Sequence, residues 1–310
     1  MNFDEFYDQI DAEIATLQSE EEKVSQRNRL QDMLRSYEGS DRIVSSHELE
    51  QMMESEPVVP TFGSGSPKLD EILGGFSYEQ LVVITAQEKT GKTAFVLQLA
   101  GAMPEQNPCC FLFEQSPREL IRQMKSRGQS VPYFLTPALN IENRWQWIQE
   151  RSMEAMVKRG SKVFFIDNVD WVGMDRQYDE RTDEKYTRLL QDMKNFCKQW
   201  GVVIFLVAHV TKMPFEEIPQ PDKIKNTSAF KQIADTVLIL WRKTTTEKVS
   251  GTKTKAPLRT SETLLWVAEN RRTGKTGYVQ LYFDGSKLVE KTWDVSLETG
   301  IEAQVEYDDL

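Results

Sequence analysis

Residues 81–97 read Leu-Val-Val-Ile-Thr-Ala-Gln-Glu-Lys-Thr-Gly-Lys-Thr-Ala-Phe-Val-Leu. The apolar run at 81–84 predicts a buried strand, and the apolar residues from Ala94 onward predict a helix that begins near Thr93. The polar turn between them has the spacing of a loop that binds phosphate groups. In such a loop the backbone N–H groups at the helix N-terminus point toward the anion, which the helix dipole also favours. We therefore expect a nucleotide-binding site here.

Each residue of this turn has an expected role. Lys92 is the ammonium that reaches the outer phosphates, and the Thr93 hydroxyl is a ligand for Mg²⁺. Ala86 replaces the glycine that usually opens such a loop, and a polar turn before an ordinary amphipathic helix is the alternative interpretation. The residues expected to surround the phosphates are Ala86, Gln87, Glu88, Lys89, Thr90, Gly91, Lys92 and Thr93.

The composition is that of a globular protein, with 310 residues, 39% hydrophobic and 28% charged. No apolar run is long enough to span a membrane, and the acidic N-terminus is unlike a signal or transit peptide. Three cysteines are present, two of them adjacent in an expected strand, which favours free, buried thiols in a reducing compartment: Cys109, Cys110 and Cys197. We expect a cytoplasmic protein with no membrane contact.

The net charge of −10 is unevenly distributed. Residues 1–56 contain 5 Lys and Arg against 15 Asp and Glu, and residues 294–310 contain 6 acidic residues and no basic ones. The intervening residues 57–293 contain 33 basic and 27 acidic residues, which fits a polyanionic ligand as well as plain solubility. We expect an acidic helical segment (1–56), one large domain (57–293) and an acidic tail (294–310).

The N-terminal segment is expected to be helical. Apolar residues at spacings near three and four, from Phe3 to Val24, predict an amphipathic helix that continues to about Tyr37. Ser45-Ser46-His47-Glu48 has the pattern of a capping box and predicts a short helix through Met53. Residues 57–67, rich in Gly, Ser and Pro, predict a linker. The long helix packs either on the rest of its own chain or on a neighbouring subunit, and we favour the neighbour for the reason given below.

Beyond residue 67, apolar strands alternate with helical patterns. The strands are expected at 81–85, 109–113, 163–166, 202–208, 236–241, 264–268 and 278–283, and the helices at 93–102, 117–127, 144–159 and 184–200. This alternation predicts an α/β fold with a mostly parallel sheet and helices on both faces. The last two strands, separated by residues 270–277, predict an antiparallel hairpin.

Three of the expected strands are followed directly by a residue whose side chain could take part in catalysis. Asp167 follows an apolar strand, where a carboxylate can hold the Mg²⁺ shell. Glu114 ends another strand, where it can polarise the water that attacks a γ-phosphate. His209 ends a third, where it can sense the γ-phosphate. A solvated aspartate, a structural glutamate and a half-buried histidine are the respective alternatives.

Four motifs together resemble one family. Residues 66–76 read Ser-Pro-Lys-Leu-Asp-Glu-Ile-Leu-Gly-Gly-Phe, 91–95 read Gly-Lys-Thr-Ala-Phe, 113–117 read Phe-Glu-Gln-Ser-Pro, and 269–277 read Glu-Asn-Arg-Arg-Thr-Gly-Lys-Thr-Gly. With residues 228–242, they are similar to the RecA-like ATPase domain of DnaB-type hexameric replicative helicases and their phage and Twinkle-like relatives. His209 falls where DnaB helicases have Gln, and residues 208–212 look more like RadA or Twinkle. The resemblance covers about residues 60–290.

This resemblance implies a P-loop ATPase that uses ATP and Mg²⁺ in a ring, with Glu114 as the catalytic base. Arg271 would act on the nucleotide of the adjacent subunit, which is why we assign the N-terminal helix to a neighbour. Glu269 stands where the family has a second basic residue, so slow hydrolysis or a role other than unwinding becomes plausible. By resemblance, DNA contacts fall on loops that contain Arg176, Arg181, Lys212, Lys223, Lys225 and Asn226, for which solvated surface charge is the alternative.

The function that this resemblance implies is an ATP-driven DNA helicase or translocase of the DnaB type, moving on single-stranded DNA during replication. The expected partners are single-stranded DNA, further copies of the chain in a hexameric ring, and a primase or loader protein. The alternatives are a RadA- or RecA-like recombination ATPase and a KaiC-like regulatory ATPase.

Overall fold

A computed structural model of the chain describes residues 20–37, 39, 42–55, 60–134, 141, 143–173, 182–210, 213–214, 217–220, 229–248 and 255–292. Its internal contacts divide the chain into two compact units, Met1–Val58 and Val59–Leu310. The predicted acidic tail, 294–310, lies outside the described residues.

Within its described residues, the first unit contains the helices α2 (Glu20–Arg35) and α3 (Ser46–Ser55). The start of the predicted long helix lies outside the described residues. The predicted capping box is confirmed, because the Ser45 N–H donates to Glu48 Oε2 at 2.8 Å and the Glu48 N–H donates to Ser45 Oγ at 3.2 Å. These two bonds satisfy N–H groups that the first turn of α3 leaves without helical partners.

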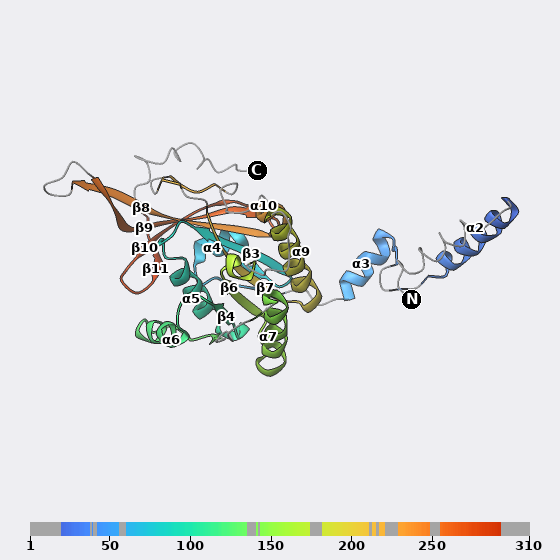
Figure 1. The fold of residues 1–310 in the computed structure, drawn as a ribbon, viewed down its shortest axis with the longest axis horizontal. Coiled ribbons are helices and arrows are strands. Elements are labelled where there is room, and N and C mark those ends of the chain that lie inside the picture. The colour runs from blue at the N-terminus through green and yellow to red at the C-terminus, as the bar shows by residue number, and fades with distance from the viewer. Residues whose placement is uncertain are drawn as a thin grey trace. The chain divides into compact units, whose positions relative to one another are not determined.

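The second unit is built around a nine-stranded sheet of order β11-β10-β9-β8-β3-β7-β6-β4-β5 (Figure 1). Neighbouring strands from β8 through β3 to β5 run parallel, whereas β9, β10 and β11 are added to β8 in antiparallel fashion. This confirms the mostly parallel sheet and the C-terminal hairpin. The strands are β3 (Gln80–Ala86), β4 (Cys109–Leu112), β5 (Tyr133–Phe134), β6 (Val163–Asp167), β7 (Val203–His209), β8 (Thr236–Lys248), β9 (Lys255–Asn270), β10 (Gly277–Phe283) and β11 (Leu288–Glu290).

Helices cover both faces of this sheet. Side chains alternate along a strand, so Val82 and Ile84 lie in one core cluster, while Leu81 and Val83 lie in the other. The first cluster packs beneath α4 (Pro67–Leu73), α5 (Lys92–Ala102) and α6 (Pro117–Ser126). The second packs beneath α7 (Arg144–Arg159), α8 (Val169–Val172), α9 (Thr182–Trp200) and α10 (Ala229–Ile233). A 3-10 turn, η1 (Pro104–Gln106), follows α5. All three cysteines are free and buried, as predicted.

None of the helices in the described part of the chain is both long and apolar enough to cross a bilayer.

The prediction of a linker over residues 57–67 is wrong for its second half. β1 (Thr61–Phe62) pairs antiparallel with β2 (Phe76–Ser77), and the Phe62 ring lies 5.4 Å from that of Tyr78. The Ser64 N–H also donates to Asp70 Oδ1 at 2.7 Å. The stretch belongs to the second unit because this aromatic contact and these hydrogen bonds outweigh the flexibility of its Gly and Ser residues.

Two strands extend beyond their predicted ends. The pairing of β8 with β9 runs from Thr236↔Asn270 to Lys248↔Lys255, with register shifts near Leu238 and Thr244. Figure 1 shows this ribbon projecting past the other strands. Its outer half consists largely of Thr, Lys and Glu, so a search for apolar runs finds only the inner half.

Candidate nucleotide-binding site

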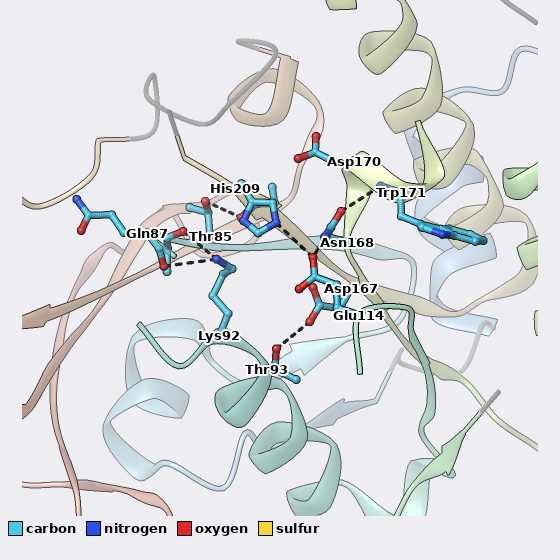
Figure 2. Close-up of polar contacts among 12 residues, drawn as sticks. Thr85, Gln87, Lys92, Thr93, Glu114, Asp167, Asn168, Asp170, Trp171 and His209 are labelled. Atoms are coloured by element: carbon cyan, nitrogen blue, oxygen red, sulfur yellow. Dashed lines mark hydrogen bonds and ion pairs between the residues drawn. The ribbon is translucent and has the colours of Figure 1, made fainter. Parts of the chain in front are cut away.

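The predicted phosphate loop lies between β3 and α5 and borders a cavity. Gly91, at the N-cap of α5, has φ +104°, a backbone conformation that residues with side chains rarely adopt. The cavity has a volume of about 540 Å³. Its lining contains five of the eight predicted loop residues and all three predicted strand-end residues: Glu88, Lys89, Gly91, Lys92, Thr93, Ala94, Leu97, Glu114, Gln115, Gln123, Asp167 and His209. Figure 2 shows Lys92 and Thr93 together with the three strand-end residues.

The ammonium of Lys92 lies over this loop. Its Nζ donates to the carbonyl oxygens of Ala86, at 3.1 Å, and Gln87, at 3.5 Å, and the residue is only 8% exposed. Burial lowers the pKa of Lys92, against the raising influence of the Asp167, Glu114 and Glu88 charges. A desolvated cation of this kind interacts strongly with an anion placed beside it.

Thr93 and Asp167 present two oxygen atoms side by side. Thr93 Oγ1 donates to Asp167 Oδ2 at 3.0 Å. Burial is the main cause that raises the pKa of Asp167 to about 6, and the charge of Glu114 adds to it, whereas the Thr93 hydrogen bond and the Lys92 charge lower it. A cation beside this carboxylate would favour its ionised form. The pair fits Mg²⁺, which binds proteins through few oxygen ligands and completes its shell with phosphates and water.

The remaining strand-end residues meet at one carboxylate oxygen. Asn168 Nδ2 donates to Glu114 Oε1, and His209 Nε2 lies 3.8 Å from the same oxygen. Asn168 Oδ1 also accepts a hydrogen bond from the Trp171 N–H at 3.0 Å, which caps the start of α8 (Figure 2). The structure thus brings Glu114, Asp167 and His209 together, as predicted, because the carboxyl ends of parallel strands share one sheet edge.

Two side chains that sequence reasoning missed donate hydrogen bonds to predicted site residues. Asn168 is one, although an Asn directly after a strand and before a short helix is a recognisable N-cap signal. Arg259, on β9, is the other: its guanidinium donates to the carbonyl oxygens of Glu88, at 2.8 Å, and Lys89. No local pattern indicates the second contact, since Arg259 lies 171 positions from Glu88.

Arg271 lies at the opposite edge of the sheet from the phosphate loop. Val82 pairs with Thr236, and Thr236 pairs with Asn270, so the turn that contains Arg271 adjoins the start of β3, whereas the phosphate loop follows its end. The structure therefore does not bring Arg271 to the cavity of its own chain. The predicted DNA-binding residues Lys212, Lys223, Lys225 and Asn226, and also Arg176 and Arg181, lie outside the described residues.

Several curated relatives are similar over most of this chain. The replicative DNA helicase DnaB of Mycoplasma genitalium is 23% identical over 280 residues, covering 78% of this chain and 59% of the relative. The DnaB helicase of Geobacillus stearothermophilus is 21% identical over 257 residues, covering 73% and 54%. The DNA repair protein RadA of Pseudomonas aeruginosa is 25% identical over 160 residues, covering 50% and 33%. The chain thus spans less than two thirds of the length of these relatives.

Solved structures share the fold. One solved ATPase domain superposes with a TM-score of 0.63 at 18% identity, covering 79% of this chain and 96% of that one. A DnaB-like replicative helicase, described together with its interactions with primase, gives 0.64 at 18% identity, covering 92% and 75%. A KaiC-like protein from Pyrococcus horikoshii gives 0.53 at 16% identity, covering 76% and 100%. These likenesses show a RecA-like ATPase fold.

One family model matches most of the second unit. The model of the DnaB-like helicase C-terminal domain matches residues 62–159 and 136–289. The matched region begins at β1 and ends in β11, so it contains the phosphate loop, the three strand-end residues and the C-terminal hairpin. This chain belongs to the DnaB-like helicase C-terminal domain family.

Proposed function

We propose that the chain is the ATP-hydrolysing part of a DnaB-type helicase or translocase that moves on single-stranded DNA during replication. One observation carries this proposal: the residues for binding and hydrolysis meet at one sheet edge, while Arg271 lies at the other. A chain so divided forms a complete site only with a second copy, and a hexameric ring in the cytoplasm, served by a primase or loader, is the assembly we propose. Membership of the family supports it.

Within one chain, the residues would act on ATP as follows. The N–H groups at the start of α5 and the Lys92 ammonium bind the phosphates. Thr93 and Asp167 hold Mg²⁺, which when bound neutralises charge on the phosphates. Glu114 takes the proton of the attacking water, and Asn168 and His209 fix the orientation of its carboxylate. His209 also links this edge to the segment after β7.

The adjacent copy would contribute Arg271. A guanidinium that reaches the γ-phosphate stabilises the charge of the transition state, and such a residue contributes about 10³–10⁵ to the rate in phosphoryl transfer. Lys212, Lys223, Lys225 and Asn226 are proposed to bind DNA phosphates in the central channel, which makes DNA affinity dependent on salt concentration.

Mixing two inactive variants tests the shared site. Arg271→Ala is expected to lose ATP turnover yet bind nucleotide, and Glu114→Gln to lose turnover with its Arg271 intact. Mixed subunits form hybrid interfaces in which an intact Glu114 faces an intact Arg271, so turnover should partly return. Lys92→Ala, which is expected to lose nucleotide binding as well, serves as the negative control. An absence of recovery at every mixing ratio would contradict the shared site.

A RadA-like recombination ATPase is the second candidate, favoured by the RadA similarity over 160 residues and by His209. Displacement of a strand from a forked duplex is expected only of the helicase. Stimulation of ATP turnover by single-stranded DNA is expected of both, and its absence would favour a KaiC-like regulatory ATPase instead.

A further inference from the structure

A second charged cluster lies at the sheet edge that faces away from the phosphate loop. Lys231 Nζ, on α10, is 3.2 Å from Glu269 Oε1, on β9. Arg271 Nη2 donates to the carbonyl oxygen of Gln232 and lies 3.5 Å from that of Lys231. Lys231 belongs to the five-residue helix whose carbonyl oxygens Arg271 contacts, so both cations belong to this edge of the sheet.

The backbone beneath this cluster is held firmly. The Arg271 N–H donates to the carbonyl oxygen of Asp235 at 2.8 Å. The Asp235 carboxylate in turn accepts from the Leu81 N–H at 2.7 Å and from Lys194 Nζ at 2.5 Å. The charged ends above this base are more open, with 59% of the Lys231 side chain and 30% of the Glu269 side chain exposed. The backbone of the cluster is therefore fixed by hydrogen bonds, while the charged ends of Lys231 and Glu269 are partly exposed to solvent.

These cations are too far from the phosphate loop of their own chain to serve it. Thr236 pairs with Val82, and Leu240 pairs with Ala86, where the loop begins. Four residues of strand span about 13 Å, and both the loop and the cluster lie beyond the ends of that span. A nucleotide within reach of Lys231 and Arg271 must therefore be bound by a different copy of the chain.

Glu269 by itself would repel such a nucleotide. Its ion pair with Lys231 offsets this charge and keeps the Lys231 ammonium at the same edge as the Arg271 guanidinium. An ion pair this exposed is weak, so the ammonium can leave Glu269 for the phosphates of a nucleotide, whose multiple charges attract it more strongly. Glu269 thus positions the Lys231 ammonium, which can move from the carboxylate to a phosphate.

We propose that Lys231 is the second cation that the chain offers to a nucleotide bound by the adjacent copy, with Glu269 positioning its ammonium next to Arg271. The inference rests on the proposed function, because it requires a site shared between copies. On this proposal, the shared site still has two cations although Glu269 is acidic, because Lys231 on α10 supplies the second one.

The first test compares two lysines that each form an exposed ion pair. Lys231→Met is expected to lower kcat for ATP about 10- to 100-fold, with little change in the affinity of its own site for a fluorescent ATP analogue. Lys158→Met, which removes the exposed partner of Glu154 on α7, is the control and is expected to keep wild-type kcat. Equal kcat for the two variants would overturn the inference.

Moving the charge separates a role in binding from a merely structural one. The double variant Lys231→Met with Glu269→Lys places an ammonium on β9 in place of the one removed from α10, and it is expected to recover most of the lost kcat. A structural ion pair would not be restored by this exchange. Should Lys231→Met not fold, as judged by its melting temperature, Lys231→Gln alone and with Glu269→Lys gives the same comparison.

Mixing separates this inference from the proposed function. Lys231→Met subunits mixed with Lys92→Ala subunits should partly recover turnover, because one of the two kinds of hybrid interface joins an intact phosphate loop to an intact Lys231. If Arg271→Ala and Glu114→Gln complement each other but Lys231→Met retains full kcat, the Lys231 inference fails and the shared site stands. If Arg271→Ala and Glu114→Gln do not complement each other, the shared site is contradicted, and the role of Lys231 is contradicted with it.

Discussion

Asn168 joins two parts of the site at the level of a single side chain. Its amide nitrogen donates to Glu114, and its amide oxygen caps α8 through the Trp171 N–H. The residue is 5% exposed, so neither bond competes much with water. The orientation of the proposed base therefore depends on the same residue that fixes the start of α8.

Asn168→Ala is expected to lower kcat by about 10- to 100-fold, with a smaller change in KM, because Glu114 loses the donor that orients it. Asn143→Ala is a matched control, since Asn143 caps α7 in the same way by accepting from the Gln146 N–H at 3.1 Å. Both variants should lose roughly 1 kcal/mol of folding free energy. Steady-state kinetics and thermal melts measure both quantities, and equal kcat values for the two would argue against a positioning role.

Asp167 predicts a dependence of stability on pH. Its pKa in the folded chain is raised to about 6 from 3.8, mainly by burial, so folding favours the protonated form. Its contribution to stability is full below pH 3.8 and is lost as pH rises through about 6. Asp167→Asn, which removes the charge and can still accept from Thr93, should stabilise the nucleotide-free protein by up to about 3 kcal/mol at neutral pH.

Thermal melts of the nucleotide-free protein at pH 4.5 and pH 7.5 check this expectation. The difference in melting temperature between Asp167→Asn and the wild type should grow toward the higher pH. Asp284→Asn is the control of opposite sign, because backbone N–H bonds from Lys287 and Ser286 lower the pKa of Asp284. A difference that is the same at both pH values would show that burial of the Asp167 charge is not its cause.

The strand-end residues of the site could be predicted because each follows an apolar run directly. Asp167, Glu114 and His209 stand where a buried strand reaches the sheet edge, and a parallel sheet gathers such ends together. The contacts of Arg259 and the pairing of Lys231 with Glu269 could not be predicted, because each joins residues far apart in the chain with no pattern at either end. The register between β8 and β9 brings these residues within reach.

At the scale of elements, the adjacent residues Arg271 and Arg272 contact different helices: Arg271 contacts α10, and Arg272 contacts the end of α4. Arg272 Nη2 donates to the carbonyl oxygens of Leu73, Gly74 and Gly75, at 2.7, 2.6 and 2.7 Å, at the C-terminal end of α4. A Cβ at Gly74 would lie 2.9 Å from this guanidinium, and the residue has φ +68°. The glycine therefore makes room for the arginine that satisfies the last carbonyls of the helix.

Arg272→Ala is expected to destabilise the fold by about 1–3 kcal/mol, because it leaves three carbonyl oxygens without their donor, among them that of the buried Leu73. Arg272→Lys should recover only part of this loss, since one ammonium does not reproduce the planar guanidinium. Arg271→Ala is the neighbouring control, expected to lose turnover with a smaller change in the midpoint of urea unfolding, because the hydrogen bonds of Arg271 to the carbonyl oxygens of α10 are exposed. Comparable shifts in that midpoint for the two alanine variants would contradict the division of roles.

The elements that could be predicted are those with strong periodicity. The helix expected at 144–159 is observed as α7 with those bounds, because its apolar spacing, an Asn cap and a terminal glycine all agree. The short strands β1, β2, β5 and β11 have two or three residues each, too few to show an alternating pattern. Their positions are set by pairing with other strands, such as β5 with β4 on the far side of α6.

At the scale of the whole molecule, the N-terminal unit is proposed to join subunits. On α3, Leu49 and Met53 are 48 and 62% exposed, and we propose that they contact a partner. Removing residues 1–56 should therefore weaken assembly while the second unit keeps its melting temperature. Sedimentation velocity with an ATP analogue measures the first effect. A profile unchanged by the deletion would mean that the segment does not join copies.

The opposite placement of the phosphate loop and Arg271 gives every copy two unlike ends. A contact between unlike ends is head-to-tail. With the proposed shared site, two copies would therefore complete one nucleotide site and leave another without its guanidinium. An open row of copies would always contain one such incomplete site, whatever its length, and only closure of the row into a ring would complete it. Turnover per subunit should therefore climb with protein concentration and level off once the first and last copies of the row meet.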